Sequence, residues 1–200
     1  MDVLQWVKDA LAVIQEIEPG VKSAAEVGTV LGTVGTAVVK VVQKGRQLVT
    51  YLITKSEPPS RKKEPDTGAP PEKADVALLI DINRRMLRDV ARYLEQQKID
   101  ADVVVVTNDP DYSDTIRFLD PDNPDEWVEL VKEFNASISR IKHTVGSARM
   151  HIFMSTPLPL AFGLGCIWGT VDEATVYHWE NGTYHPSMKV SRALRQADRT

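Results

Sequence analysis

The sequence of 200 residues contains a single cysteine, Cys166, and this scarcity excludes two classes of architecture. One thiol cannot form the disulfide framework of a small secreted domain, and it cannot build a cysteine-based zinc site. The N-terminus lacks the basic stretch and the small-residue cleavage site of a signal peptide, and acidic residues occur at positions 2, 9, 16 and 18. We therefore expect a protein of a reducing compartment.

Motifs of nucleotide hydrolysis and dinucleotide binding are also missing. No G-x-x-x-x-G-K-[ST] segment occurs, and the run GLGCIW has Trp168 where a dinucleotide fingerprint needs its third glycine. The four histidines are not spaced as metal ligands, and Cys166 falls in an apolar run that predicts a buried, inert thiol. The sequence thus predicts no catalytic residue, no metal site and no cofactor.

A positive net charge is absent as well. Twenty-eight acidic residues outnumber 24 basic ones, which leaves a formal net charge of −4 and a pI near 5.6. This balance disfavours binding of long nucleic acids. The hydrophobic fraction of 42% and the charged fraction of 26% are those of an ordinary globular protein.

Composition divides the chain into three predicted segments. Residues 1–55 are apolar and helical in pattern, and residues 56–73 form a linker that holds five of the twelve prolines and almost nothing apolar. Residues 74–200 alternate between buried strands and helices. The strands are predicted at 75–82, 101–109 and 150–155, the helices at 83–97, 123–145 and 158–169, and a hairpin at 174–190.

This alternation predicts an α/β, Rossmann-like domain with a mostly parallel sheet and a C-terminal antiparallel hairpin, preceded by an all-helical N-terminal segment. Asn181-Gly182 is a strong signal for the hairpin turn. In such sheets ligands bind beyond the carboxyl ends of the strands. The residues expected there, as candidates for ligand binding, are Asn83, Arg84, Arg85, Thr107, Asn108, Ser155, Thr156, Pro157 and Leu158.

The last part of the chain resembles the closing half of SAVED domains, relatives of the CARF sensors of bacterial antiviral systems. The resemblance rests on a His-Ile-Phe strand from His151, the Thr156-Pro157 loop, the small-residue helix that follows, and the Tyr184-His185-Pro186 return strand. It implies binding of a cyclic oligonucleotide, such as a cyclic oligoadenylate, made by a defence cyclase or a CRISPR polymerase. Residues 74–200 suffice for one CARF-like unit only, so the resemblance implies a homo-oligomer with a ligand site shared between chains.

Residues 24–42 suggest how this sensor acts once it has bound its ligand. Gly28, Gly32 and Gly35 lie in a run of apolar and small residues, and Gly28-x-x-x-Gly32 is the spacing of closely packed membrane helices. As a helix, 19 residues would span about 28 Å, close to the hydrocarbon core of a bilayer. Basic residues follow this run, which predicts an inner-membrane protein with a cytoplasmic sensor domain.

Two functions of different classes remain open at this point. In the first, ligand binding assembles the chains, and their N-terminal helices depolarise or breach the inner membrane. In the second, the protein is cytoplasmic and forms a ligand-triggered scaffold that activates a separate enzyme. The spacing of a soluble helical bundle supports this alternative and is found at Val27, Leu31, Val34, Val38 and Val41. A small Rossmann-like enzyme with an unidentified substrate is the least favoured.

Overall fold

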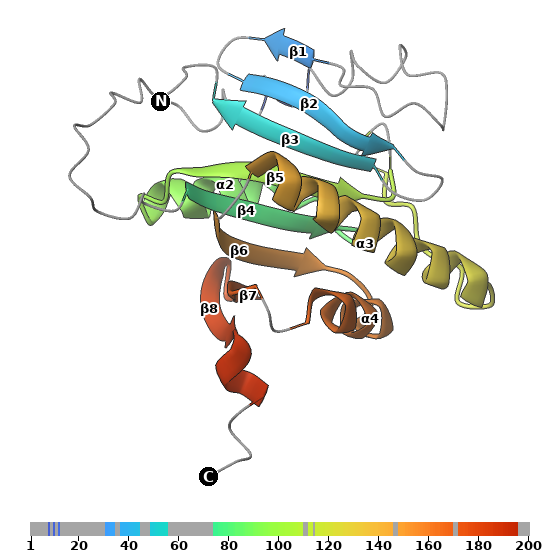
Figure 1. Cartoon of the computed structure of the whole chain (residues 1–200). Coiled ribbons are helices and arrows are strands. Elements are labelled where there is room, and N and C mark those ends of the chain that lie inside the picture. Colours follow the sequence, from blue (N-terminus) through green and yellow to red (C-terminus); the bar gives the residue numbers. More distant parts are fainter. Residues whose placement is uncertain are drawn as a thin grey trace.

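A computed structural model gives the fold of the chain (Figure 1). It describes residues 8, 10, 12, 31–34, 37–44, 49–55, 74–109, 112–113, 115–145, 148–169 and 172–195. The predicted linker, residues 56–73, lies outside the described residues, as do Gly28 and Gly35.

One eight-stranded sheet organises the described part of the chain, with the strand order β1-β2-β3-β5-β4-β6-β7-β8. Its strands are β1 (Leu31–Val34), β2 (Ala37–Lys44), β3 (Val49–Lys55), β4 (Ala74–Asp81), β5 (Ala101–Thr107), β6 (Ala148–Ser155), β7 (Ala174–Glu180) and β8 (Thr183–Val190). The helices are α2 (Leu87–Gln96), α3 (Pro124–Val145), α4 (Leu158–Trp168) and the short 3₁₀ helix η2 (Arg192–Arg195).

The centre of the sheet is parallel and both of its sides are antiparallel. Strands β5, β4, β6 and β7 run in one direction, and long apolar runs such as VALLI in β4 are buried on both faces. The predicted hairpin β7–β8 is confirmed, and Asn181 and Gly182 both have the positive φ of a type I′ turn. The prediction of a mostly parallel sheet holds only for this centre, because β1, β2 and β3 add three antiparallel pairings through β5.

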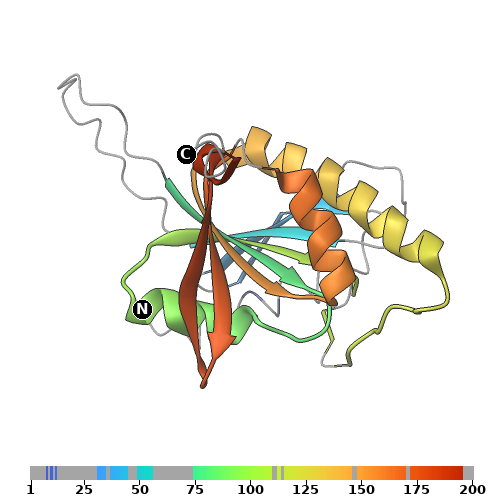
Figure 2. The same ribbon diagram turned by 90° about the horizontal axis from the view of Figure 1, so that it is seen from below.

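Helices cover both faces of the sheet, as Figure 2 shows. Helix α2 covers one face, where its residues Leu87, Val90 and Leu94 belong to a core with Leu79 of β4 and Phe153 of β6. Helices α3 and α4 cover the other face, over a second core that contains the alternate residues of the same strands. Each central strand therefore supplies side chains to two cores, which explains its uninterrupted apolar sequence.

The helix predicted for residues 24–42 is wrong for the part that the structure describes. Leu31–Val34 and Ala37–Lys44 are paired strands, and Gly32 lies in β1 opposite Val39 of β2. In a short apolar run, the spacing of the hydrophobic residues cannot show whether the segment is a helix or a strand. The Val and Thr residues that dominate this run favour extended backbone. Among the described residues, no helix combines the length and the apolar character needed to cross a bilayer.

Strand β3 connects β1 and β2 to the parallel centre of the sheet. Tyr51 pairs with Val105 of β5, and the buried hydroxyl of Thr50 donates to Ser137 Oγ of α3 at 3.2 Å. Of the predicted N-terminal helix, Lys8, Ala10 and Ala12 are described and are helical, and Ala10 is part of the core under α2. The strands before and after residues 56–73 thus belong to one sheet.

Candidate ligand site at the carboxyl ends of the parallel strands

The carboxyl ends of β4, β5 and β6 meet at one edge of the sheet. The chain leaves β4 toward α2 on one face and leaves β6 toward α4 on the other face, so the two connections diverge between neighbouring strands (Figure 2). Such a divergence is the position where open α/β sheets bind ligands. At its base the backbone N–H groups of Ile82 and Asn83 both donate to the carbonyl of Ser155, at 3.1 and 2.8 Å.

Asp81, the last residue of β4, is buried at this edge. Its Oδ2 accepts hydrogen bonds from the Met86 backbone N–H at 2.8 Å and from the Tyr112 hydroxyl at 2.5 Å. Asp81 thereby satisfies the backbone N–H of Met86, the residue after which α2 begins. Burial raises the pKa of Asp81, and burial together with this carboxyl raises the pKa of Tyr112 well above its ordinary value.

Arg85 is enclosed by protein groups. Its guanidinium donates to Asp109 Oδ2 at 2.5 Å, to Asp81 Oδ1 at 3.3 Å and to the Ser113 carbonyl at 2.8 Å. A longer contact of 3.4 Å joins it to the Thr107 hydroxyl. The hydrogen bonds of Arg85 connect the ends of β4 and β5 and the loop after β5, and only 15% of its side chain is exposed.

Arg84 points away from Arg85, toward the C-terminal hairpin. Its Cζ lies 4.5 Å from the ring centre of Trp179 on β7, and its Nη2 donates to the hydroxyl of Tyr184 on β8 at 3.2 Å. Its Nη1 lies 3.2 Å from the carboxylate of Asp89 on α2. Of the Arg84 side chain, 41% is exposed. The two neighbouring arginines therefore contact different elements: Arg85 contacts the ends of β4 and β5, and Arg84 contacts the β7–β8 hairpin.

Thr107 and Asn108, at the end of β5, face opposite sides of the sheet. The Thr107 hydroxyl lies on the Arg85 side and accepts from the Asp109 backbone N–H at 3.1 Å. Asn108 is buried, and its Nδ2 donates to the Arg117 carbonyl at 2.8 Å. Its Oδ1 is the single buried side-chain acceptor without a hydrogen-bond partner among the described residues. Asn108 therefore holds the loop after β5 in place on the side of α3.

The loop after β6 is open to solvent where α4 begins. The hydroxyl of Thr156 contacts the Pro157 carbonyl at 3.3 Å, and Pro157 precedes the first turn of the helix. Leu158 is 82% exposed, and Phe162, one turn later, is 75% exposed. Since α4 contains no charged side chain, these residues give it an apolar outer face. Cys166 is exposed on this helix, so the prediction of a buried thiol is wrong.

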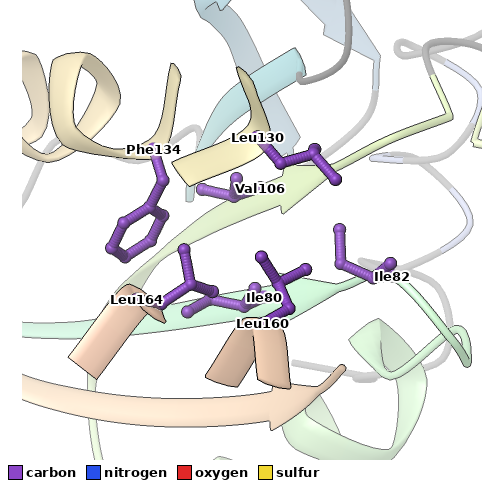
Figure 3. A pocket seen from close by; sticks show the side chains of 7 residues that line it. All are labelled: Ile80, Ile82, Val106, Leu130, Phe134, Leu160 and Leu164. Carbon is purple, nitrogen blue, oxygen red and sulfur yellow. The ribbon is translucent and has the colours of Figure 1, made fainter. Parts of the chain in front are cut away.

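A small apolar pocket lies behind this edge, between α3, α4 and the sheet (Figure 3). It is lined by Ile80, Ile82, Val106, Leu130, Phe134, Leu160 and Leu164. No polar group lines it. This pocket is a gap between packed helices, and a charged ligand has no partner there.

Sequence reasoning missed the aromatic and acidic partners of the two arginines. Tyr112, Trp179 and Tyr184 come from segments far along the chain, and burial raises the pKa of Tyr184 to about 12. The alternation of the hairpin sequence gives a partial signal, because it places Tyr177 and Trp179 on one face of β7. Within the described ranges, no cluster of three or more histidine, cysteine or acidic residues is arranged to hold a metal ion.

Comparison with known proteins identifies a family for most of the chain. The sequence model described as "SMODS-associated and fused to various effectors sensor domain", abbreviated SAVED, matches residues 18–190. The match includes β1, β2 and β3 as well as the parallel centre of the sheet. No curated protein matches the sequence.

Solved structures of the Acinetobacter baumannii Cap4 SAVED/CARF-domain containing receptor have a similar fold. Its complex with the cyclic trinucleotide 2′3′3′-cAAA gives a TM-score of 0.50 and 16% sequence identity, and the likeness covers 60% of this chain and 26% of that one. Its complex with 3′3′3′-cAAA gives a TM-score of 0.48 at 15% identity, covering 60% and 25%. The chain thus spans about a quarter of the length of the receptor it matches.

Proposed function

The chain belongs to the SAVED family of sensor domains, and we propose from this membership that it binds a cyclic oligonucleotide second messenger in antiviral defence. The family match over residues 18–190 is the observation that carries the proposal. Support comes from the receptor of similar fold, which has been solved in complex with the cyclic trinucleotide 2′3′3′-cAAA.

We place the ligand at the carboxyl edge of β4, β5 and β6. Asn83, Ser155 and Thr156 are partly exposed there and offer hydroxyl, amide and backbone groups to a ribose or a phosphodiester. Arg85 acts as a positioning residue in this proposal, because its hydrogen bonds hold the strand ends in place. Thr107 and Asn108 have the same role at the end of β5.

A screen of melting temperatures tests this proposal. The full chain is mixed with cyclic di-, tri- and tetranucleotides, including 3′3′3′-cAAA and 2′3′3′-cAAA. A ligand present at 100 times its Kd stabilises the folded state by about 2.7 kcal/mol, which raises the melting temperature by several degrees. A melting temperature that no cyclic nucleotide changes would refute the sensor function.

We also propose that the ligand joins two copies of the chain. The carboxyl edge of one chain contacts the cyclic ligand from one side only. The apolar outer face of α4 begins at the loop after β6, which borders the proposed site. A face without charge is suited to pack against its own copy about a two-fold axis, because no like charges then meet. The second copy would bury Leu158 and Phe162, which are otherwise exposed.

For the output we favour the scaffold over disruption of a membrane. The residues that would have supplied much of the membrane helix, Leu31–Val34 and Ala37–Lys44, are strands of the sensor sheet in the structure. Assembly of sensor domains changes the distance between the proteins that are bound to them. We propose that this change activates a separate effector.

A further inference from the structure

We propose that Arg84, stacked on Trp179, forms a platform on which a base of the bound cyclic oligonucleotide stacks. This inference rests on the function proposed above. It assigns the base, and not the phosphodiester, as the part of the ligand that contacts Arg84. Trp179 and Tyr184, which hold the guanidinium, are then part of the ligand site.

Three elements contact the Arg84 guanidinium. The Cζ atom lies over the ring of Trp179 of β7, 4.5 Å from the ring centre. Two contacts of 3.2 Å, from Nη2 to Tyr184 Oη and from Nη1 to Asp89 Oδ2, restrain the group on two further sides. A planar cation held in this way is ordered before the ligand arrives, so binding requires little further loss of side-chain entropy.

The support beneath Arg84 is an aromatic cluster. The rings of Trp179 and Tyr184 meet edge to face with centroids 4.7 Å apart. Tyr184 is buried and packs in turn against Phe153, at 4.9 Å, and Tyr93, at 5.8 Å. Because these rings belong to the core under α2, the platform stands on the rigid part of the domain.

Charge favours a base over a phosphate at this position. Asp89 already pairs with Arg84, and Asp81 and Asp109 pair with Arg85, so three carboxyl groups accompany two guanidinium groups at the edge. A phosphodiester at Arg84 would share the guanidinium with the Asp89 carboxylate and be repelled by it. The Arg84 side chain is 41% exposed, and a guanidinium can stack on an aromatic ring, for which a purine offers the larger surface.

Lysine is the decisive substitution, because it keeps the charge of Arg84 and removes its flat face. We expect Arg84→Lys to weaken the binding of 3′3′3′-cAAA and 2′3′3′-cAAA by about 5- to 150-fold, the range of one lost base stack. Arg84→Gln, which removes the charge but keeps a planar amide, should lose less affinity than Arg84→Lys. Arg92→Lys, on the exposed side of α2, is the matched control and should leave the Kd unchanged.

Isothermal titration calorimetry on the full chain measures these constants, and the melting temperature of each variant shows that it is folded. Trp179→Leu gives a second test, because it leaves the arginine but removes the ring beneath it. Equal affinities of the wild type and Arg84→Lys, or a loss in Arg84→Gln alone, would overturn the platform and leave the sensor function standing. A wild-type chain that binds neither trinucleotide nor any other cyclic oligonucleotide would overturn both.

Discussion

Asp75, near the start of β4, forms a second charged cluster at the opposite edge of the sheet. Arg149 of β6 donates two hydrogen bonds to its carboxylate, at 2.8 and 2.6 Å, and His151 Nε2 lies 3.0 Å from the same group. The other ring nitrogen of His151 lies 2.8 Å from the hydroxyl of Tyr177, whose pKa burial raises to about 12. His151 is therefore part of a structural network between β4, β6 and β7.

This network predicts a pH-dependent contribution to stability. Burial acts to raise the pKa of Asp75, but the hydrogen bonds from Arg149 and His151 outweigh it and hold the pKa below the ordinary value of 3.8. A carboxyl group with a lowered pKa stabilises the fold above pH 3.8, and this contribution is lost as the pH falls through the lowered value. Asp75→Asn should cost at most about 1 kcal/mol at pH 7, and the cost should shrink below pH 3.8.

Urea unfolding of the wild type and of Asp75→Asn between pH 7 and pH 3 measures the difference. Asp122→Asn, at an exposed loop position, serves as the control and should show no comparable cost at pH 7. A difference between the wild type and Asp75→Asn that stays constant over the whole range would contradict the assignment.

At the scale of secondary-structure elements, α4 contains two glycines that meet different surroundings. A Cβ on Gly163 would lie 3.1 Å from Val131 Cγ2 of α3, whereas a Cβ on Gly165 would meet nothing within 4 Å. Gly163 therefore allows α3 and α4 to approach each other, and Gly165 has no such role. The same helix carries the exposed Leu158 and Phe162, so one side of it packs closely while the other side is open.

The two glycines predict opposite results for the same substitution. Gly165→Ala should stabilise the protein by about 0.5–1 kcal/mol, because alanine has the higher helix propensity and no atom obstructs its methyl group. Gly163→Ala should stabilise less or destabilise, because Val131 must move to admit the methyl group. Chemical unfolding of both variants measures the pair, and an equal gain from both would show that α3 and α4 are not in close contact there.

At the scale of the whole molecule, two cores share one sheet, and the outer face of α4 is exposed. The proposed pairing of two copies predicts that ligand binding increases the molecular mass in solution, and that Phe162→Lys prevents this increase. Phe162 is 75% exposed, so the substitution should have little effect on the folding of a single chain. A lysine at this position would oppose its own copy and would have to be desolvated.

Sedimentation velocity with and without 3′3′3′-cAAA measures this association. Val128→Lys on α3, which also replaces an exposed apolar residue, is the matched control and should assemble like the wild type. If Phe162→Lys assembles as well as the wild type, the two copies do not meet at α4. If no ligand changes the mass of the wild type, the proposal of ligand-linked pairing is wrong.

The sequence alone determined the parallel centre of the sheet, the helices α2, α3 and α4, and the hairpin. These elements follow from local information: apolar runs bounded by turn residues, the amphipathic periods of α2 and α3, and the Asn181-Gly182 turn. Because the order of strands and helices defines where the chain leaves the sheet, the positions of Arg84, Thr107 and Ser155 at the edge also followed from the sequence.

Only the tertiary structure decided the state of residues 31–34 and 37–44 and the different roles of Arg84 and Arg85. An apolar run rich in valine has both helical and extended solutions, and the choice is made by pairing with β3, which in turn pairs with β5 about 50 residues farther along the chain. The two arginines are neighbours in the sequence, but one meets Asp109 and the other meets Trp179. Such contacts join residues distant in sequence, and no local pattern encodes them.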